Sequence, residues 1–176
     1  MTVVVGVAWA YVGGREVELT LGSFRREEKQ TVGQGLETKP MDFGQCNYVI
    51  NEDLEIAALK LIANERKTRR VKQLVADADV TQAARSHAQD MVDYNYFSHA
   101  DREGEDAGDR LERAGIKYEV VGENLAFAGN LATAHKGLMA SQTHRSNILE
   151  SRFGRVGVGV LDGGGCGVVE VQNFAD

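Results

Sequence analysis

The sequence lacks the features that mark several large classes of protein. It has two cysteines, one proline and one tryptophan in 176 residues, so it is neither a disulfide-dense scaffold nor a proline-rich linker. No apolar run approaches the roughly 20 residues of a membrane-spanning helix, and we expect no transmembrane segment. Basic residues are also fewer than acidic ones, which gives a net charge of −6 and a pI near 5.3. That balance argues against nucleic acid or an anionic membrane surface as the main partner.

Several cofactor and catalytic signatures are missing as well. There is no P-loop, no dinucleotide-binding glycine pattern and no His-Glu-x-x-His, so we expect no organic cofactor. A Ser-His-carboxylate triad could be drawn from Ser98 or Ser141, but no Gly-x-Ser-x-Gly elbow supports it. The apolar start, Met1 to Val12, has no basic n-region and is better interpreted as a strand than as a signal peptide.

The two cysteines, Cys46 and Cys166, lie far apart and make no metal-binding signature. Two interpretations stay open from the sequence. Both residues are free buried thiols, or one disulfide joins the N-terminal segment to a C-terminal turn. The redox state of the compartment decides between these interpretations.

Residues 1–50 differ from the rest of the chain. Apolar and polar residues alternate over Val17–Leu21, which is strand periodicity. Gly13-Gly14 separates this stretch from the apolar Val3–Val12, so a β-hairpin is predicted, followed by a polar linker. We therefore divide the chain into an N-terminal hairpin and linker over 1–50 and a separate domain over 51–176.

The second part alternates helical and strand-like patterns. Amphipathic helices are predicted to begin near Glu52, Asp79, Asp106 and Asn130. Strand-like stretches are Lys117–Phe127, Arg155–Leu161 and Gly167–Phe174. Asp79, with Gln82 three residues later, resembles a capping box. The pattern favours an α+β fold with a mostly antiparallel sheet.

Three short motifs contain the histidines and the glutamate that are the main candidates for metal binding or proton transfer. They are His99 in Asn-Tyr-Phe-Ser-His, Glu123 in Gly-Glu-Asn-Leu-Ala and His144 in Ser-Gln-Thr-His-Arg-Ser-Asn-Ile-Leu. His99 follows a helix end, and His144 is expected in a polar loop. A carboxylate such as Glu123 entering a strand costs folding energy unless it is paired or solvated. Imidazoles and a carboxylate that converge on one cleft can hold a divalent metal or move protons.

The other polar candidates have simpler interpretations. His87 and His135 lie on predicted helices and are interpreted as packing or surface residues. The acidic run from Asp101 to Glu112 does not have the spacing of an EF-hand loop. It is interpreted as a solvated loop, with weak calcium binding as the alternative.

Six short motifs occur in a fixed order, and together they indicate a family. They are Leu-Ile-Ala-Asn-Glu-Arg (61–66), Ala-Arg-Ser-His-Ala-Gln-Asp-Met (84–91), Tyr-Phe-Ser-His (96–99), Gly-Glu-Asn-Leu-Ala (122–126), His-Arg-Ser-Asn-Ile-Leu (144–149) and Val-Gly-Val-Gly-Val (156–160). In this order the sequence resembles the CAP superfamily, which contains cysteine-rich secretory proteins, antigen 5 and pathogenesis-related 1 proteins. The bacterial SCP-domain branch is most similar, over roughly residues 53–174.

The resemblance implies an α-β-α sandwich with a small antiparallel sheet between helical layers. It also implies a secreted or cell-envelope location and a surface cleft that binds zinc or another divalent cation in some members. His99, Glu123 and His144 match the cleft positions, and the two histidines are the candidate metal ligands. Ser141 stands where eukaryotic members often carry a second glutamate, which favours a binding role over efficient catalysis.

Three hypotheses for function follow, two from the resemblance and one from the N-terminal hairpin. The first is a cleft that binds a divalent cation and a small ligand or envelope component, without being an enzyme. The second is a metal-dependent, peptidase-like hydrolase that uses Glu123 or a metal-bound water in the same cleft. The third makes the N-terminal hairpin the surface that contacts a protein partner, since strand edges recruit partners by strand addition.

Overall fold

A computed structural model describes residues 4–5, 9–12, 16–17 and 41–176, with only the backbone course for the first three segments. The helices are α1 (Glu52–Thr68), α2 (Ala78–Asp93), α3 (Ala107–Arg113), α4 (Leu131–Ala140), α5 (Gln142–Leu149) and a 3-10 turn at Gly164–Cys166. The strands are β1 (Val4–Val5), β2 (Trp9–Val12), β3 (Glu16–Val17), β4 (Val49–Ile50), β5 (Val75–Ala76), β6 (Val120–Ala128), β7 (Arg155–Asp162) and β8 (Val168–Ala175).

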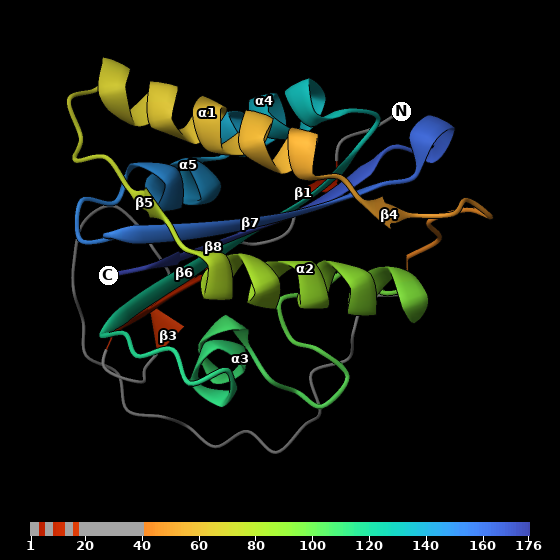
Figure 1. The fold of residues 1–176 in the computed structure, drawn as a ribbon, viewed down its shortest axis with the longest axis horizontal. Coiled ribbons are helices and arrows are strands. Elements are labelled where there is room, and N and C mark those ends of the chain that lie inside the picture. The colour runs from red at the N-terminus through yellow and green to blue at the C-terminus, as the bar shows by residue number, and fades with distance from the viewer. Residues whose placement is uncertain (1–3, 6–8, 13–15, 18–40) are drawn as a thin grey trace.

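The described elements form three layers, with one sheet between two groups of helices. Strand order is β3-β2-β6-β8-β7-β4, with β1 also on β6 and β5 also on β7. Helices α1, α4 and α5 cover one face, and α2 and α3 cover the other (Figure 1). This arrangement confirms the predicted α-β-α sandwich. The strands pair antiparallel except for β5, which runs parallel to β7.

Alternation along β6 decides which layer each of its side chains enters. Val120 and Ala126 pack with residues of α1, α4 and α5. Val121 and Leu125 pack with residues of α2 and α3. Because successive side chains of a strand point to opposite faces, neighbouring positions enter different layers. Odd positions of β6, including Glu123, therefore face α2 and α3.

The Val-Gly-Val-Gly-Val motif lets α2 lie close against β7. The three valines of the motif are buried in the core beneath α1, whereas the glycines face α2. A Cβ on Gly157 would lie 2.2 Å from the Thr81 amide nitrogen, and one on Gly159 would lie 2.5 Å from that of Arg85. Both clashes are with helix backbone, which cannot rotate away. The glycines therefore fix the distance between α2 and the sheet.

The helix ends test the predicted caps. Asn51 caps α1 and accepts a hydrogen bond from the Leu54 amide, which agrees with the predicted start near Glu52. The prediction for α2 is wrong, because Asp77 and not Asp79 is the cap. The polar loop predicted around His144 is also wrong, since α5 occupies that stretch. Ser141 is the single residue between α4 and α5.

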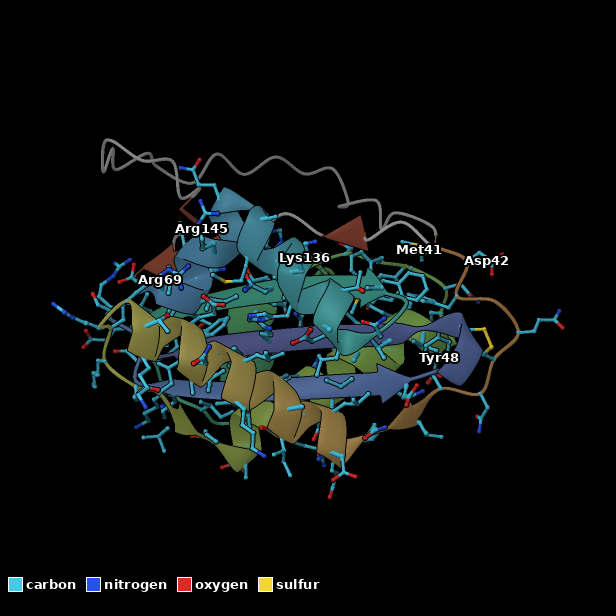
Figure 2. The ribbon with its side chains drawn as sticks, turned by 90° about the horizontal axis from the view of Figure 1, so that it is seen from above. Met41, Asp42, Tyr48, Arg69, Lys136 and Arg145 are labelled. Carbon is cyan, nitrogen blue, oxygen red and sulfur yellow. A yellow bond between two sulfur atoms is a disulfide. The ribbon has the colours of Figure 1, made fainter. Side chains whose placement is uncertain are left out.

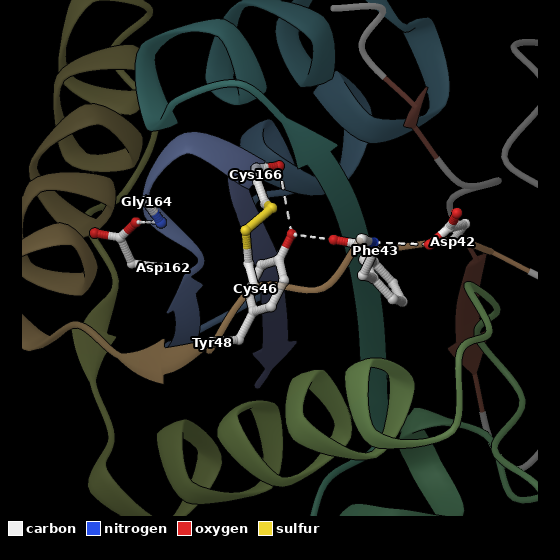
Figure 3. Close-up of a disulfide and its surroundings, with 8 residues drawn as sticks. Asp42, Phe43, Cys46, Tyr48, Asp162, Gly164 and Cys166 are labelled. Carbon is white, nitrogen blue, oxygen red and sulfur yellow. Dashed lines mark hydrogen bonds between the residues drawn. A yellow bond between two sulfur atoms is a disulfide. The ribbon is translucent and has the colours of Figure 1, made fainter.

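The cysteines form a disulfide, which settles the two interpretations left open above. Cys46 and Cys166 are joined with Cα atoms 6.2 Å apart and 120 positions apart in sequence. Figure 2 shows the bond at the same end of the molecule as Met41. The Tyr48 hydroxyl lies 3.2 Å from the Phe43 carbonyl oxygen and 3.3 Å from that of Cys166 (Figure 3). The segment before β4 is thus anchored to the β7–β8 turn.

The N-terminal strands extend the central sheet. β2 pairs antiparallel with β3, with Ala10 opposite Val17, which confirms the predicted hairpin for the described residues. β1 and β2 both pair with β6. The rest of the hairpin and the linker up to residue 40 lie outside the described residues. The division into 1–50 and 51–176 stays a prediction.

The close contact at Gly157 makes a direct test of the packing of α2 on β7. We expect Gly157→Ala to lower the free energy of unfolding by roughly 3 kcal/mol, because the new methyl group overlaps helix backbone. Gly165→Ala is the matched control, since nothing lies within 4 Å of its added Cβ. The control should stay within about 0.5 kcal/mol of the wild type in urea unfolding. Equal effects would contradict this account of the motif.

Candidate functional site

The loop that follows α2 positions His99 through buried anchors on either side. Tyr96 and Phe97 are buried in the core, and the Tyr96 hydroxyl donates to the Asp90 carboxylate. His87, on α2, donates from Nε2 to the Ser98 carbonyl oxygen at 2.9 Å. The loop is therefore held against α2 immediately before His99.

Glu123 is the centre of a buried charged cluster on the α2/α3 face of β6. His99 Nδ1 lies 2.7 Å from Glu123 Oε1, and Arg110 Nη2 lies 2.7 Å from Oε2. The Glu123 and Arg110 side chains are only 1% and 4% exposed. Arg110 Nη1 also donates to the carbonyl oxygens of His99 and Glu105. One guanidinium on α3 thus fixes both the carboxylate and the loop that carries the histidine.

The electrostatics follow from this pairing. Burial alone would raise the pKa of Glu123, but Arg110, His87 and the hydrogen bond from His99 together outweigh burial and hold the pKa at about 2. Burial and the nearby Arg110 charge lower the pKa of His87 to about 4. Glu123 is therefore ionised and His87 neutral at pH 7. An ionised carboxylate only accepts hydrogen bonds, so His99 carries its proton on Nδ1.

His144 approaches β6 from the opposite face. It lies on α5, is 2% exposed, and its Nδ1 is hydrogen-bonded to Ser141 Oγ at 2.7 Å. Figure 2 shows α5, with Arg145 labelled, and α4, with Lys136 labelled, over the sheet on the side of α1. The two candidate histidines therefore come to β6 from different helical layers.

Two buried asparagines attach α5 to β6 beside Glu123. Asn147 Nδ2 donates to the Glu123 carbonyl oxygen at 3.1 Å and to Asn124 Oδ1 at 3.0 Å. Asn124 Nδ2 in turn donates to the His144 carbonyl oxygen at 3.1 Å and to Gln172 Oε1 at 3.0 Å. All three amide side chains are fully buried. Adjacent residues of one strand thus hold the two histidine-bearing segments.

Some buried polar atoms near the site have no hydrogen-bond partner among the described residues. They include His99 Nε2, His87 Nδ1 and both polar atoms of the Asn173 amide. Asn173 is fully buried on β8 and pairs directly across from Glu123, so the two side chains share a face. Buried polar atoms in native proteins normally have partners. These atoms are the ones on the α2/α3 face that a bound polar species would satisfy.

The described donors do not form a closed metal site. Among residues 41–176, no group of three or more His, Cys, Asp or Glu side chains is placed to hold a metal ion. Both oxygens of Glu123 already accept hydrogen bonds, so this residue orients His99 rather than offering a ligand atom. An imidazole whose Nδ1–H is held by a carboxylate presents Nε2 outward, which is the usual arrangement of a metal-binding histidine.

Sequence reasoning missed several residues of this region. Arg110 lies in the acidic stretch that was interpreted as a solvated loop, although Asp101 there is 5% exposed and accepts the Glu103 and Glu105 amides. His87 was interpreted as a packing residue, and it does pack, while also fixing the His99 loop. Asn124 and Asn147 lie inside the quoted motifs. The position of Asn124 inside a predicted strand was a signal that could have found it, because an amide in a strand that packs in a core needs a hydrogen-bond partner.

Comparison with known proteins identifies the family. The family model described as CAP, the cysteine-rich secretory protein family, matches residues 59–174. The matched region contains α2 to α5, the strands β5, β6 and β7, and all of β8 except Ala175. The chain belongs to the CAP family, and its bacterial relatives place it in the bacterial branch.

The most informative relatives are bacterial. The uncharacterised protein YkwD of Bacillus subtilis is 34% identical over 62% of this chain, but only 43% of YkwD is covered. A Bacillus anthracis extracellular protein containing an SCP domain has a TM-score of 0.65 at 31% identity, covering 70% of this chain and 40% of that one. An outer surface protein of Borrelia burgdorferi shares the fold, with a TM-score of 0.70 at 16% identity, covering 75% and 98%.

The buried ion pair gives a prediction for stability. We expect Arg110→Met to lower the free energy of unfolding by roughly 3–5 kcal/mol, because it leaves the Glu123 carboxylate buried without its cation. Arg113→Met on the same helix is the matched control, since that side chain is 60% exposed and should lose at most about 1 kcal/mol. Adding Glu123→Gln to Arg110→Met should recover part of the loss. No recovery in urea unfolding would show that the pair is not coupled.

Glu170, at the end of the same amide network, gives a prediction for pH dependence. Its side chain is buried and accepts from Gln172 Nε2 at 2.7 Å, and burial raises its pKa from 4.5 to about 7. Because this pKa is raised on folding, the contribution of Glu170 to the free energy of unfolding is full below pH 4.5. That contribution is lost as the pH rises through 7. We therefore expect the free energy of unfolding of Glu170→Gln, relative to that of the wild type, to rise by roughly 2–3 kcal/mol from pH 5 to pH 8. A parallel pH profile for both proteins in urea unfolding would contradict this.

Proposed function

We propose that this chain is a secreted or cell-envelope CAP domain whose His99/His144 site binds a divalent cation and, with it, a small ligand or envelope component. The observation that carries the proposal is the state of His99. His99 Nδ1 lies 2.7 Å from Glu123 Oε1, and His99 Nε2 is buried without a hydrogen-bond partner among the described residues. An imidazole nitrogen held in this orientation suits a ligand for zinc or a similar cation.

His144 is the second ligand in this proposal, which requires the two imidazoles to meet at the edge of β6, since α5 lies on one face of the sheet and the His99 loop on the other. His144 Nδ1 is hydrogen-bonded to Ser141, so the nitrogen that His144 offers to a ligand is Nε2. Two imidazoles make an open site, and water or the bound ligand would supply the remaining positions. Such a site binds zinc more weakly than a site with three or four protein ligands. The polar Asn173 side chain opposite Glu123 supports a bound polar species near the same strand.

The location outside the cytoplasm rests on two kinds of support. The Cys46–Cys166 disulfide suits an oxidising compartment. The relatives from B. anthracis and B. burgdorferi are described as an extracellular protein and an outer surface protein. No described helix is long and apolar enough to span a membrane. The chain spans less than half of the length of YkwD and of the B. anthracis protein.

The alternative, a metal-dependent hydrolase, has less support from the geometry. A general base works best when its pKa lies near the operating pH. The pKa of Glu123 is held at about 2, and both of its oxygens are engaged by His99 and Arg110. Turnover of a peptide library in the presence of zinc, abolished in Glu123→Gln, would restore this alternative.

Zinc titration by calorimetry at pH 7.5 tests the proposed site. We expect the wild type to bind zinc and His99→Ala/His144→Ala to lose at least about tenfold in affinity, because both proposed ligands are removed. Affinity should also fall below about pH 6, since a ligating imidazole must be neutral.

His135→Ala is the matched control for that titration. His135 is also a largely buried helix histidine, but its Nε2 lies 3.5 Å from the Glu65 carboxylate of α1, and it is not a proposed ligand. Its removal should leave zinc affinity unchanged. If the wild type binds no zinc, or if the double variant binds as tightly as the wild type, the cation site is wrong.

A further inference from the structure

The edge of β6 that does not contact β8 is occupied by short strands from the N-terminus. β8 pairs with β6 from Val121 to Ala128 without a break. On the other edge, β1 pairs at Ala126 and Phe127, and β2 pairs from Val120 to Glu123 (Figure 1). The family match begins at residue 59 and so excludes β1, β2 and β3. Within the matched region, β6 is therefore an edge strand.

The strand β2 pairs with β6 at the candidate site itself. Trp9 of β2 lies opposite Glu123, and Ala10 lies opposite Gly122. β6 connects the two histidine-bearing segments, because Glu123 contacts the His99 loop and Asn124 contacts α5. β2 lies along that connection. Any segment that takes its place would lie beside both.

The pairing is of a kind that another peptide can imitate. β1, β2 and β3 have two, four and two residues, against eight for β7 and for β8. The β1 and β2 sequences, Val-Val and Trp-Ala-Tyr-Val, carry no charge. Main-chain hydrogen bonds supply the affinity in strand addition, and alternate side chains supply selectivity. Short ladders at a sheet edge open more readily than long central ones.

The N-terminal strands stay tethered to the domain even when they leave β6. The Met41 amide donates to the Asn95 carbonyl oxygen at 3.0 Å, Phe43 is buried, and Cys46 is fixed by the disulfide. The chain is thus anchored to the domain from Met41 onward. A tethered strand has a high effective concentration at its own acceptor, so it competes with free peptide.

We propose that the β6 edge over residues 120–127 is an acceptor for an extended, uncharged peptide strand, and that β1 and β2 occupy it in cis as a built-in competitor. The partner is a peptide segment that adds antiparallel to β6 beside Glu123. This inference goes beyond cation binding and rests only on the strand pairing, so either proposal can fail without the other.

The test uses the full chain and a fluorescent synthetic peptide of residues 4–12, none of which is a charged residue. Neighbouring amides of a strand point to opposite sides, so Ala10→Pro/Tyr11→Pro removes one donor from each of the ladders that β2 makes. We expect the peptide to bind this variant at least about tenfold more tightly than the wild type, measured by fluorescence anisotropy. Ala10→Val/Tyr11→Val, which keeps both amides, should behave as the wild type. A scrambled peptide should bind none of the proteins.

Hydrogen exchange supplies a second measurement on the wild type, independent of the folding of the proline variant. At saturating peptide, the β2 amides should lose protection while residues 120–123 of β6 stay protected. The proposal is overturned if the peptide binds all three proteins equally, or if β2 keeps its protection at saturation. It is also overturned if a folded proline variant, by circular dichroism, binds no peptide.

Discussion

The buried pair of Arg110 and Glu123 is the interaction on which the arrangement of the site depends. A carboxylate that is 1% exposed in the middle of a sheet would destabilise the fold if it were alone. The guanidinium compensates that charge and uses its remaining donors on the loop carbonyls of His99 and Glu105. Five donors in a rigid fork allow one side chain to do this, and a lysine could not. The charge that β6 buries therefore determines where α3 and the His99 loop lie.

A second constraint is steric rather than electrostatic. The glycines of the Val-Gly-Val-Gly-Val motif bring the α2 backbone against β7, while the valines of the same strand fill the core under α1. An ion pair between Arg85 of α2 and Glu55 of α1, with Nε and Oε1 2.8 Å apart, joins the two helical layers directly. Because α2 also carries His87, its distance from the sheet sets the position of the loop that ends at His99. Backbone packing and site geometry are thus linked through one helix.

Most of the fold could be predicted from the sequence, because it depends on apolar periodicity and caps. The amphipathic stripe after Asn51 and the alternation over 155–161 are local patterns, and the structure has a helix and a strand there. α5 could not be predicted in this way. Its inward positions are His144, Asn147 and Ile148, so two of its three buried side chains are polar. Such a helix is stabilised by partners on β6 that are distant in sequence, and hydrophobic periodicity does not detect them.

The same limit explains why the sequence analysis found neither the burial of Arg110 nor the pairing of the N-terminal strands with β6. Nothing local separates Arg110 from Arg113, yet one is 4% exposed and the other 60%. The difference arises from Glu123, 13 residues away. For β2, the apolar stretch Val3–Val12 indicates a strand but not its neighbour, and the neighbour is the strand that bears Glu123. An otherwise open sheet edge favours association with other chains. A strand of the same chain protects that edge, and its short ladder still leaves the edge open to exchange.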